Sequence, residues 1–189
     1  MMTSHPISDE SFNTLLCVLE SFTTLSFKFK LALKAVLHES AFPKDKVILN
    51  FKQTQGQVWF MLEGLAREIR EDRETLEEQT SWFWQAMTFI YTEPGFFGQQ
   101  PSSRSIQVIE MSKMLFIGYS DWKLLKDTFP EAERITELIR SYYTLERQQH
   151  SEEIKSLGTE ERYLNKEDLL QDLFSKKIQS HKENAAALL

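Results

Sequence analysis

The chain of 189 residues contains a single cysteine, Cys17, and few residues that interrupt helices, with five prolines and six glycines. One cysteine excludes an internal disulfide and a zinc site built from several cysteines of one chain, and it fits a reducing compartment. No run approaches the roughly 20 apolar residues of a membrane-spanning helix, and residues 1–10 show no basic segment followed by an apolar run. We therefore expect a soluble, cytoplasmic protein with no membrane partner.

An excess of positive charge is also absent. The 22 lysines and arginines stand against 28 aspartates and glutamates, which gives a formal net charge of -6. This balance excludes a protein whose whole surface attracts nucleic acid phosphates, so any contact with DNA requires a local basic patch. The chain is 41% hydrophobic and 12% aromatic, which fits one compact domain with a short appendage and excludes disorder as the main state.

The N-terminal region has the apolar spacing of helices. From Phe12 to Leu37, apolar residues recur at intervals of three and four, which predicts two helices within residues 9–41, interrupted near residues 23–26. Pro43 is expected to end the second helix, because its ring disfavours helical dihedral angles at the residue before it. Cys17 lies among apolar neighbours and is expected to be buried.

Helical spacing returns after Pro130. The apolar stripe from Ile135 to Leu145 predicts one helix from Glu131 to about Lys155, roughly 25 residues or about 37 Å long. A stripe of this length usually packs against a second helix, so we expect a homodimer that forms through it. A shorter helix is expected after Thr159.

The middle of the chain consists of short apolar runs separated by turn residues, which indicates antiparallel strands of a small barrel or sandwich. Between two groups of strands, Phe89 to Ser105 combines aromatic residues with prolines and glycines, so we expect an irregular binding loop there. The predicted strands lie near residues 46–49, 58–62, 66–71, 76–83, 106–108 and 115–119, with turns at 54–57, 63–64 and 72–74.

Charged and aromatic residues cluster in this middle region. The charged run from Glu68 to Glu78 is expected to form a solvated hairpin tip, since charge runs usually mark exposed faces. For each aromatic ring core packing is the favoured interpretation, and the alternative is that two rings line a pocket for a planar ligand. The rings in question are Trp82, Phe83, Trp84, Phe89, Tyr91, Phe96 and Phe97.

No set of residues has the spacing of a catalytic or metal site. The four histidines, His5, His38, His150 and His181, fall in predicted helices or in the N-terminal tail, where a metal-binding barrel does not place its ligands. Glycine-rich phosphate loops and a strained serine turn are also missing. We therefore expect no catalytic residues, no metal and no enzymatic activity.

A series of motifs, each weak alone, follows one order along the chain: Lys44–Leu49, Val58–Arg67, Thr80–Phe83, Phe89–Ile90, Ser105–Glu110, Leu115–Tyr119, Phe129–Glu131 and Gly158–Tyr163. Taken together, over about residues 10–180, the series resembles the Crp/Fnr transcription regulators with their cyclic nucleotide-binding barrel. The resemblance implies an α+β fold with an antiparallel β-barrel of jelly-roll type (a double-stranded β-helix) flanked by N-terminal helices. A long dimerisation helix and the short helices of a helix-turn-helix would follow.

The first departure from this family lies in its ligand motif. Ligand-binding members hold the ribose hydroxyl with a Gly-Glu pair and the cyclic phosphate with an Arg-Ser or Arg-Thr pair. Here these positions carry Tyr91-Thr92 and Ser102-Ser103, so the carboxylate is lost and the guanidinium is displaced to Arg104. In an extended segment residues 102 and 104 face the same side, so Arg104 either contacts an anion or is a surface arginine.

The resemblance nevertheless assigns a set of candidate ligand-binding residues. Positions on the long helix that would contact adenine fall near Arg147 and Gln148, neither of which is the small hydroxyl residue expected there. The complete candidate set is Phe89, Tyr91, Thr92, Ser102, Ser103, Arg104 and Arg147.

The second departure lies at the C-terminus. Residues 169–178 resemble the entry into the family's helix-turn-helix, but residues 179–189 do not continue as a basic recognition helix. From Glu146 to Leu189 there are nine acidic and seven basic residues, and no basic side chain follows Lys182. We expect three regions: helices and barrel in residues 1–130, the dimerisation helix in 131–157, and a vestigial or truncated helix-turn-helix in 158–189.

The resulting functional hypothesis is a non-enzymatic Crp/Fnr-like transcriptional regulator or signal-sensing protein. Canonical cyclic nucleotide binding is expected to be weak or absent and DNA binding impaired; the effector would be a cyclic nucleotide or another small anionic ligand, with no other cofactor. The alternative is a ligand-free dimeric barrel that acts as a scaffold for a protein partner.

Overall fold

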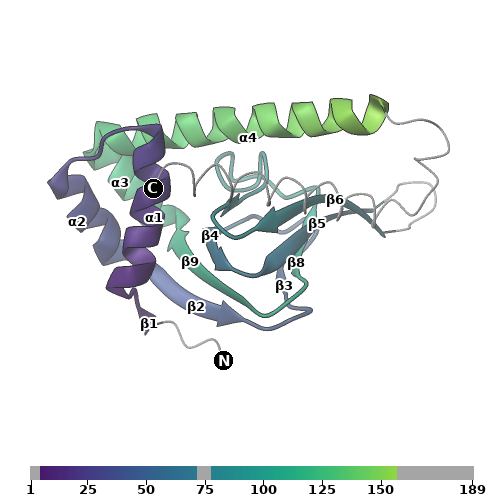
Figure 1. Cartoon of the computed structure of the whole chain (residues 1–189), viewed down its shortest axis with the longest axis horizontal. Coiled ribbons are helices and arrows are strands. Elements are labelled where there is room, and N and C mark those ends of the chain that lie inside the picture. The colour runs from purple at the N-terminus through teal and green to yellow at the C-terminus, as the bar shows by residue number, and fades with distance from the viewer. Residues whose placement is uncertain (1–4, 72–77, 157–189) are drawn as a thin grey trace, which may run out of the picture. The chain divides into compact units, whose positions relative to one another are not determined.

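The computed structural model describes residues 5–71 and 78–156 (Figure 1). The predicted turn at 72–74 and the predicted helix-turn-helix region lie outside these ranges. The chain forms two compact units, Met1–Ile139 and Arg140–Leu189. The elements in chain order are β1 (His5–Pro6), α1 (Asp9–Phe22), α2 (Phe27–Val36), β2 (His38–Phe42), β3 (Val47–Leu49), β4 (Gln57–Glu63), β5 (Leu65–Glu71), β6 (Glu78–Gln85), β7 (Phe89–Ile90), β8 (Ser105–Val108), β9 (Ser112–Gly118), α3 (Tyr119–Thr128) and α4 (Pro130–Ser156).

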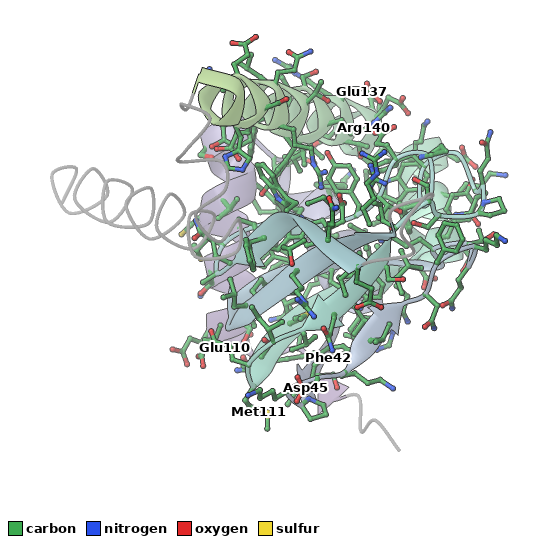
Figure 2. All side chains as sticks on the ribbon, turned by 90° about the vertical axis from the view of Figure 1, so that its right-hand side faces the viewer. Phe42, Asp45, Glu110, Met111, Glu137 and Arg140 are labelled. Atoms are coloured by element: carbon green, nitrogen blue, oxygen red, sulfur yellow. The ribbon has the colours of Figure 1, made fainter. Side chains whose placement is uncertain are left out.

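The strands form two antiparallel sheets of jelly-roll type, and not a closed barrel (Figure 1). The five-stranded sheet has the order β1-β2-β9-β4-β7, and the four-stranded sheet has the order β3-β8-β5-β6. At one end the turns after β2 and β8 lie side by side, where Figure 2 labels Phe42, Asp45, Glu110 and Met111. There the Asp45 amide donates to the Val108 carbonyl over 2.8 Å. The predicted α+β class and the antiparallel strands are confirmed.

One face of the four-stranded sheet is almost completely buried. On β5, Ala66 lies opposite Trp84 and Val108, and Glu68 lies opposite Trp82 and Ile106. Because side chains alternate along a strand, Ala66 and Glu68 point to the same face. Every side chain of this group is 4% exposed or less. The tryptophans of β6 therefore pack in the core, as the favoured interpretation of the sequence predicted.

The N-terminal helices begin where serine caps are available. The Ser8 hydroxyl accepts from the Ser11 amide over 3.1 Å and the Ser26 hydroxyl accepts from the Phe29 amide over 3.2 Å, which satisfies amides that have no partner within the helix. The break between α1 and α2 confirms the predicted interruption near residues 23–26. Buried leucines of α1, Leu15 and Leu19, face the core.

The predicted second helix is too long at its C-terminal end. It was expected within residues 9–41, but α2 ends at Val36 and residues His38–Phe42 form β2, which pairs with β9. The ladder to β9 satisfies the backbone of this segment, so pairing overrides the helical spacing. His38 consequently lies in a strand, which corrects its predicted helical position, and His5 lies in β1. Within residues 5–71 and 78–156 no three metal-ligating side chains cluster.

Cys17 is exposed, which contradicts its predicted burial. The buried positions of α1 include Phe12, Leu15 and Leu19, at spacings of three and four residues. Cys17 lies two residues from both Leu15 and Leu19, and residues two apart point to different sides of a helix.

Among the helices that the structure describes, none combines the length and hydropathy needed to cross a membrane.

Candidate ligand-binding site

The segment between β7 and β8 folds into a compact irregular loop, as predicted. After the cis peptide bond Glu93–Pro94, the Phe96 amide donates to the Thr92 carbonyl over 3.2 Å and the Gly98 amide donates to the Pro94 carbonyl over 2.9 Å. Phe96 is fully buried, with its ring 5.4 Å from that of Trp122 on α3. The loop is therefore anchored to the helix that precedes α4.

Gln55 holds the first half of this loop in place. It is fully buried, and its side-chain Oε1 accepts from the Thr92 amide over 2.8 Å and from the Thr92 hydroxyl over 3.0 Å. Its Nε2 donates to the Gln57 carbonyl over 2.7 Å. A Cβ atom on Gly95 would lie 2.1 Å from the Thr92 hydroxyl oxygen, so only glycine fits there without a shift. The Thr92 side chain is thus engaged within the protein.

Ser102 holds the second half of the loop. Its amide donates to the Gln53 carbonyl over 3.0 Å, and its carbonyl accepts from the Lys52 amide over 2.8 Å. The Ser102 hydroxyl donates to the Arg104 carbonyl over 2.9 Å and accepts from the Arg104 amide over 3.1 Å. Ser102 is buried and its hydroxyl bonds to the local backbone, whereas Ser103 is exposed.

Arg104 forms an ion pair with a carboxylate of the buried sheet face. Its Nε lies 3.4 Å from Oε1 of Glu68, and the Ser81 hydroxyl donates to the same oxygen over 2.7 Å. The Glu68 side chain is 4% exposed and that of Arg104 is 30% exposed. Glu68 was expected at a solvated hairpin tip, and this prediction is wrong because the alternation of β5 turns the side chain inward.

The remaining predicted residues take different positions. The Phe89 ring packs 4.9 Å from that of Phe60, and the buried Tyr91 ring lies 5.2 Å from that of Phe97. Arg147 lies on α4 in the second unit. The structure thus joins Thr92, Ser102 and Arg104 in one loop and adds Gln55 and Glu68, which the sequence analysis missed.

The electrostatics of this site differ from those of an open anion pocket. A guanidinium is the strongest side-chain ligand for a phosphate, because it donates several charge-assisted hydrogen bonds. Here that guanidinium has a carboxylate as a neighbour inside the protein. At the position that the resemblance assigns to a carboxylate, the side chain is a neutral threonine, and its hydroxyl donates to Gln55.

No family model and no curated protein matches the chain. Solved structures do match. A cyclic nucleotide-binding domain from Methylobacillus flagellatus has a TM-score of 0.71 at 16% identity, covering 83% of this chain and 90% of its own. The catabolite activator protein of Thermus thermophilus has a TM-score of 0.58 at 16% identity, covering 73% and 63%.

A third solved structure extends the comparison to a regulator of another organism. The c-di-GMP-responsive global regulator CLP of Xanthomonas campestris has a TM-score of 0.56 at 16% identity, covering 70% of this chain and 66% of its own. At a sequence identity of 16%, the similarity to these three structures shows a shared fold and no more. The two sheets, the loop between β7 and β8 and the helices that flank them therefore form a cyclic nucleotide-binding domain fold.

Proposed function

We propose that the chain is a non-enzymatic Crp/Fnr-like transcriptional regulator or signal-sensing protein, and that its nucleotide site binds canonical cyclic nucleotides weakly or not at all. The ion pair between Arg104 and the buried Glu68 carries this proposal. The solved structures of the same fold, which include two bacterial regulators, support the sensory role.

The buried carboxylate opposes a bound phosphate. A phosphate that contacts Arg104 carries the same sign of charge as Glu68, whose oxygen already lies 3.4 Å from the guanidinium. Like charges at close range repel each other, and the repulsion is stronger near a buried group than in water. We therefore expect the affinity for a cyclic phosphate to be lowered. The effector is accordingly a different small molecule, or a cyclic nucleotide that binds only weakly.

The long helix supports the proposal of a homodimer. On α4, Leu138, Tyr142 and Leu145 are 36%, 39% and 55% exposed at spacings of four and three residues. Apolar side chains at this spacing form the seam between paired helices. We propose that ligand binding at the loop changes the geometry of this pair, as a shift between conformations of the dimer.

We further propose that DNA binding is impaired. This proposal rests only on the sequence of residues 146–189, in which acidic residues outnumber basic ones. An electrophoretic mobility shift assay with duplex DNA at several salt concentrations tests this point. Tight binding that weakens steeply with salt would contradict it, since such a slope reports phosphate contacts by basic side chains.

The alternative function, a scaffold for a protein partner, has one observation in its favour. Phe27 and Leu31, one turn apart on α2, are 79% and 60% exposed, and Leu124 on the contacting helix α3 is 63% exposed. Exposed apolar side chains one turn apart on a helix, such as Phe27 and Leu31, can mark an interaction site. A partner that binds the wild-type chain but not the Phe27→Asp variant would favour this function.

Isothermal titration calorimetry with cyclic AMP and cyclic GMP tests the proposed site. We expect no saturable heat from the wild-type chain and weak binding by Glu68→Gln, because the amide removes the competing charge while retaining the shape of the side chain. Adding Arg104→Ala to Glu68→Gln should abolish that binding. Tight binding by the wild-type chain would contradict the proposal.

A further inference from the structure

A cavity of about 100 Å³ lies in the first unit, between the helices and the five-stranded sheet. Leu19 of α1, Phe29 of α2 and Leu125 of α3 contribute to its helical wall, together with Ala132 near the start of α4. Strands β4, β7 and β9 form the opposite wall. The cavity is therefore bordered by elements far apart in the sequence, and it is partly open to the surface.

The lining of this cavity is almost entirely apolar. Two of its polar groups bond to each other, because the Trp122 indole N–H donates to the Thr136 hydroxyl over 3.2 Å. That hydroxyl donates in turn to the Ala132 carbonyl over 2.7 Å. A water molecule needs two to four polar partners, so it is poorly held in such a space. An empty apolar void also forfeits dispersion contacts along its walls.

We propose that this cavity binds a small uncharged apolar molecule, of the size of a benzene ring or a short alkyl chain. A dry cavity of about 150 Å³ with aliphatic and aromatic walls is known to bind benzene or xenon. This cavity is smaller, at about 100 Å³, but its walls have the same chemistry. The ligand would gain the dispersion contacts that the void lacks, and it would displace no well-bonded water.

The position of the cavity links it to the candidate site. Phe89, Tyr91 and Phe97 belong to the strand and loop that the sequence marks for ligand binding, and all three contribute to its wall. The alternative interpretation of these rings, a pocket for a planar ligand, thus gains a specific location. A ligand here would contact the loop, α3 and the first turns of α4 together, and it would do so without using Arg104. The proposal does not depend on the nucleotide site being inactive.

Titration calorimetry of the full chain with benzene tests the proposal, with Ala132→Leu as the variant that fills the cavity. Ala35→Leu is the matched control, because Ala35 is an exposed residue of α2 that does not line the cavity. We expect one molecule of benzene per chain for the wild type and for Ala35→Leu, and an affinity at least tenfold lower for Ala132→Leu.

A second variant keeps the test decisive if Ala132→Leu fails to fold. Leu125→Ala enlarges the cavity, and we expect it to bind benzene or a larger ring such as indole more tightly than the wild type does. No saturable binding of benzene by the wild type, or equal binding by the wild type and a folded Ala132→Leu variant, would overturn the proposal. If Leu125→Ala binds benzene and indole with the same relative affinities as the wild type, this result would also count against the proposal.

Discussion

The Nε atom of Arg104 lies 3.4 Å from the Oε1 atom of Glu68, a carboxylate buried on the inner face of β5. Two residues that are 36 positions apart in the sequence thus form an ion pair at the end of the loop in which we propose the nucleotide site. The Ser81 hydroxyl adds a neutral hydrogen bond to the same carboxylate oxygen. We interpret this arrangement as an internal substitute for a bound anion.

Arg104→Ala is expected to lower the free energy of unfolding by about 2 kcal/mol, because the buried carboxylate of Glu68 loses a positively charged neighbour. The estimate lies below the range for fully buried pairs, since Arg104 is 30% exposed. In the double variant with Glu68→Gln, part of this loss should be recovered. Urea denaturation of the two single variants and the double variant measures the coupling. Strictly additive effects would show that the two side chains do not interact.

Gln55→Ala should destabilise the protein by about 3 kcal/mol, because the amide and the hydroxyl of Thr92 would lose a buried acceptor. Hydrogen exchange should accelerate at the Thr92 amide in particular. Gln100→Ala provides the control, since Gln100 is an exposed residue of the same loop. If both substitutions change stability equally, Gln55 does not anchor the loop.

Glu39 on β2 predicts a dependence of stability on pH. Burial alone would raise the pKa of its carboxyl, but hydrogen bonds from Lys113, the Ser8 amide and the Ser11 hydroxyl outweigh burial, so the pKa is lowered from its ordinary value of 4.5. The ionised carboxylate therefore stabilises the folded state above that pH, and the contribution is lost as the pH falls below it. Glu39→Gln should reduce stability at pH 7 by about 1 kcal/mol.

The pH dependence itself provides the control for Glu39. Thermal unfolding between pH 7 and pH 3 should show a smaller loss of stability for Glu39→Gln than for the wild type, because the amide does not titrate. Parallel curves for the two proteins would indicate that other carboxyl groups account for the acid sensitivity.

Leu145→Glu should weaken the proposed dimer. Leu145 is 55% exposed on α4, and a charged side chain on the seam between two helices would be buried without a partner in the dimer. Sedimentation equilibrium should report a monomer for this variant and a dimer for the wild type. Thr144→Glu is the control. Thr144 is an exposed neighbour of Leu145 on a different side of the helix, so this variant should remain a dimer. A monomeric wild type would contradict the proposal.

The fold was predictable where apolar spacing is regular over several turns or strands. The spacing from Ile135 to Leu145 predicted a helix close to the observed α4, and alternating or continuous apolar runs predicted strands that overlap β3 to β6, β8 and β9. Strand β2 was missed because the short segment His38–Phe42 directly follows a helical pattern and pairs with β9, which lies about 70 residues later in the sequence.

The site was predictable only in part. The order of motifs led to the loop and to Thr92, Ser102 and Arg104, but the partners of these residues gave no local signal. Glu68 lies in a charged run that is typical of exposed hairpins, although its position two residues after Ala66 on the same strand face was an available clue. Gln55 lies in a predicted turn between two other glutamines, Gln53 and Gln57, and its burial depends on tertiary contacts with the loop.

The central claim is that Arg104 is paired within the protein and therefore unavailable to a cyclic phosphate. A crystal structure of the wild-type chain soaked with cyclic AMP tests it most directly. We predict that difference density shows no nucleotide in the site and that the Arg104 guanidinium remains on Glu68. Density for a cyclic phosphate within hydrogen-bond distance of Arg104, with Glu68 displaced, would contradict the account.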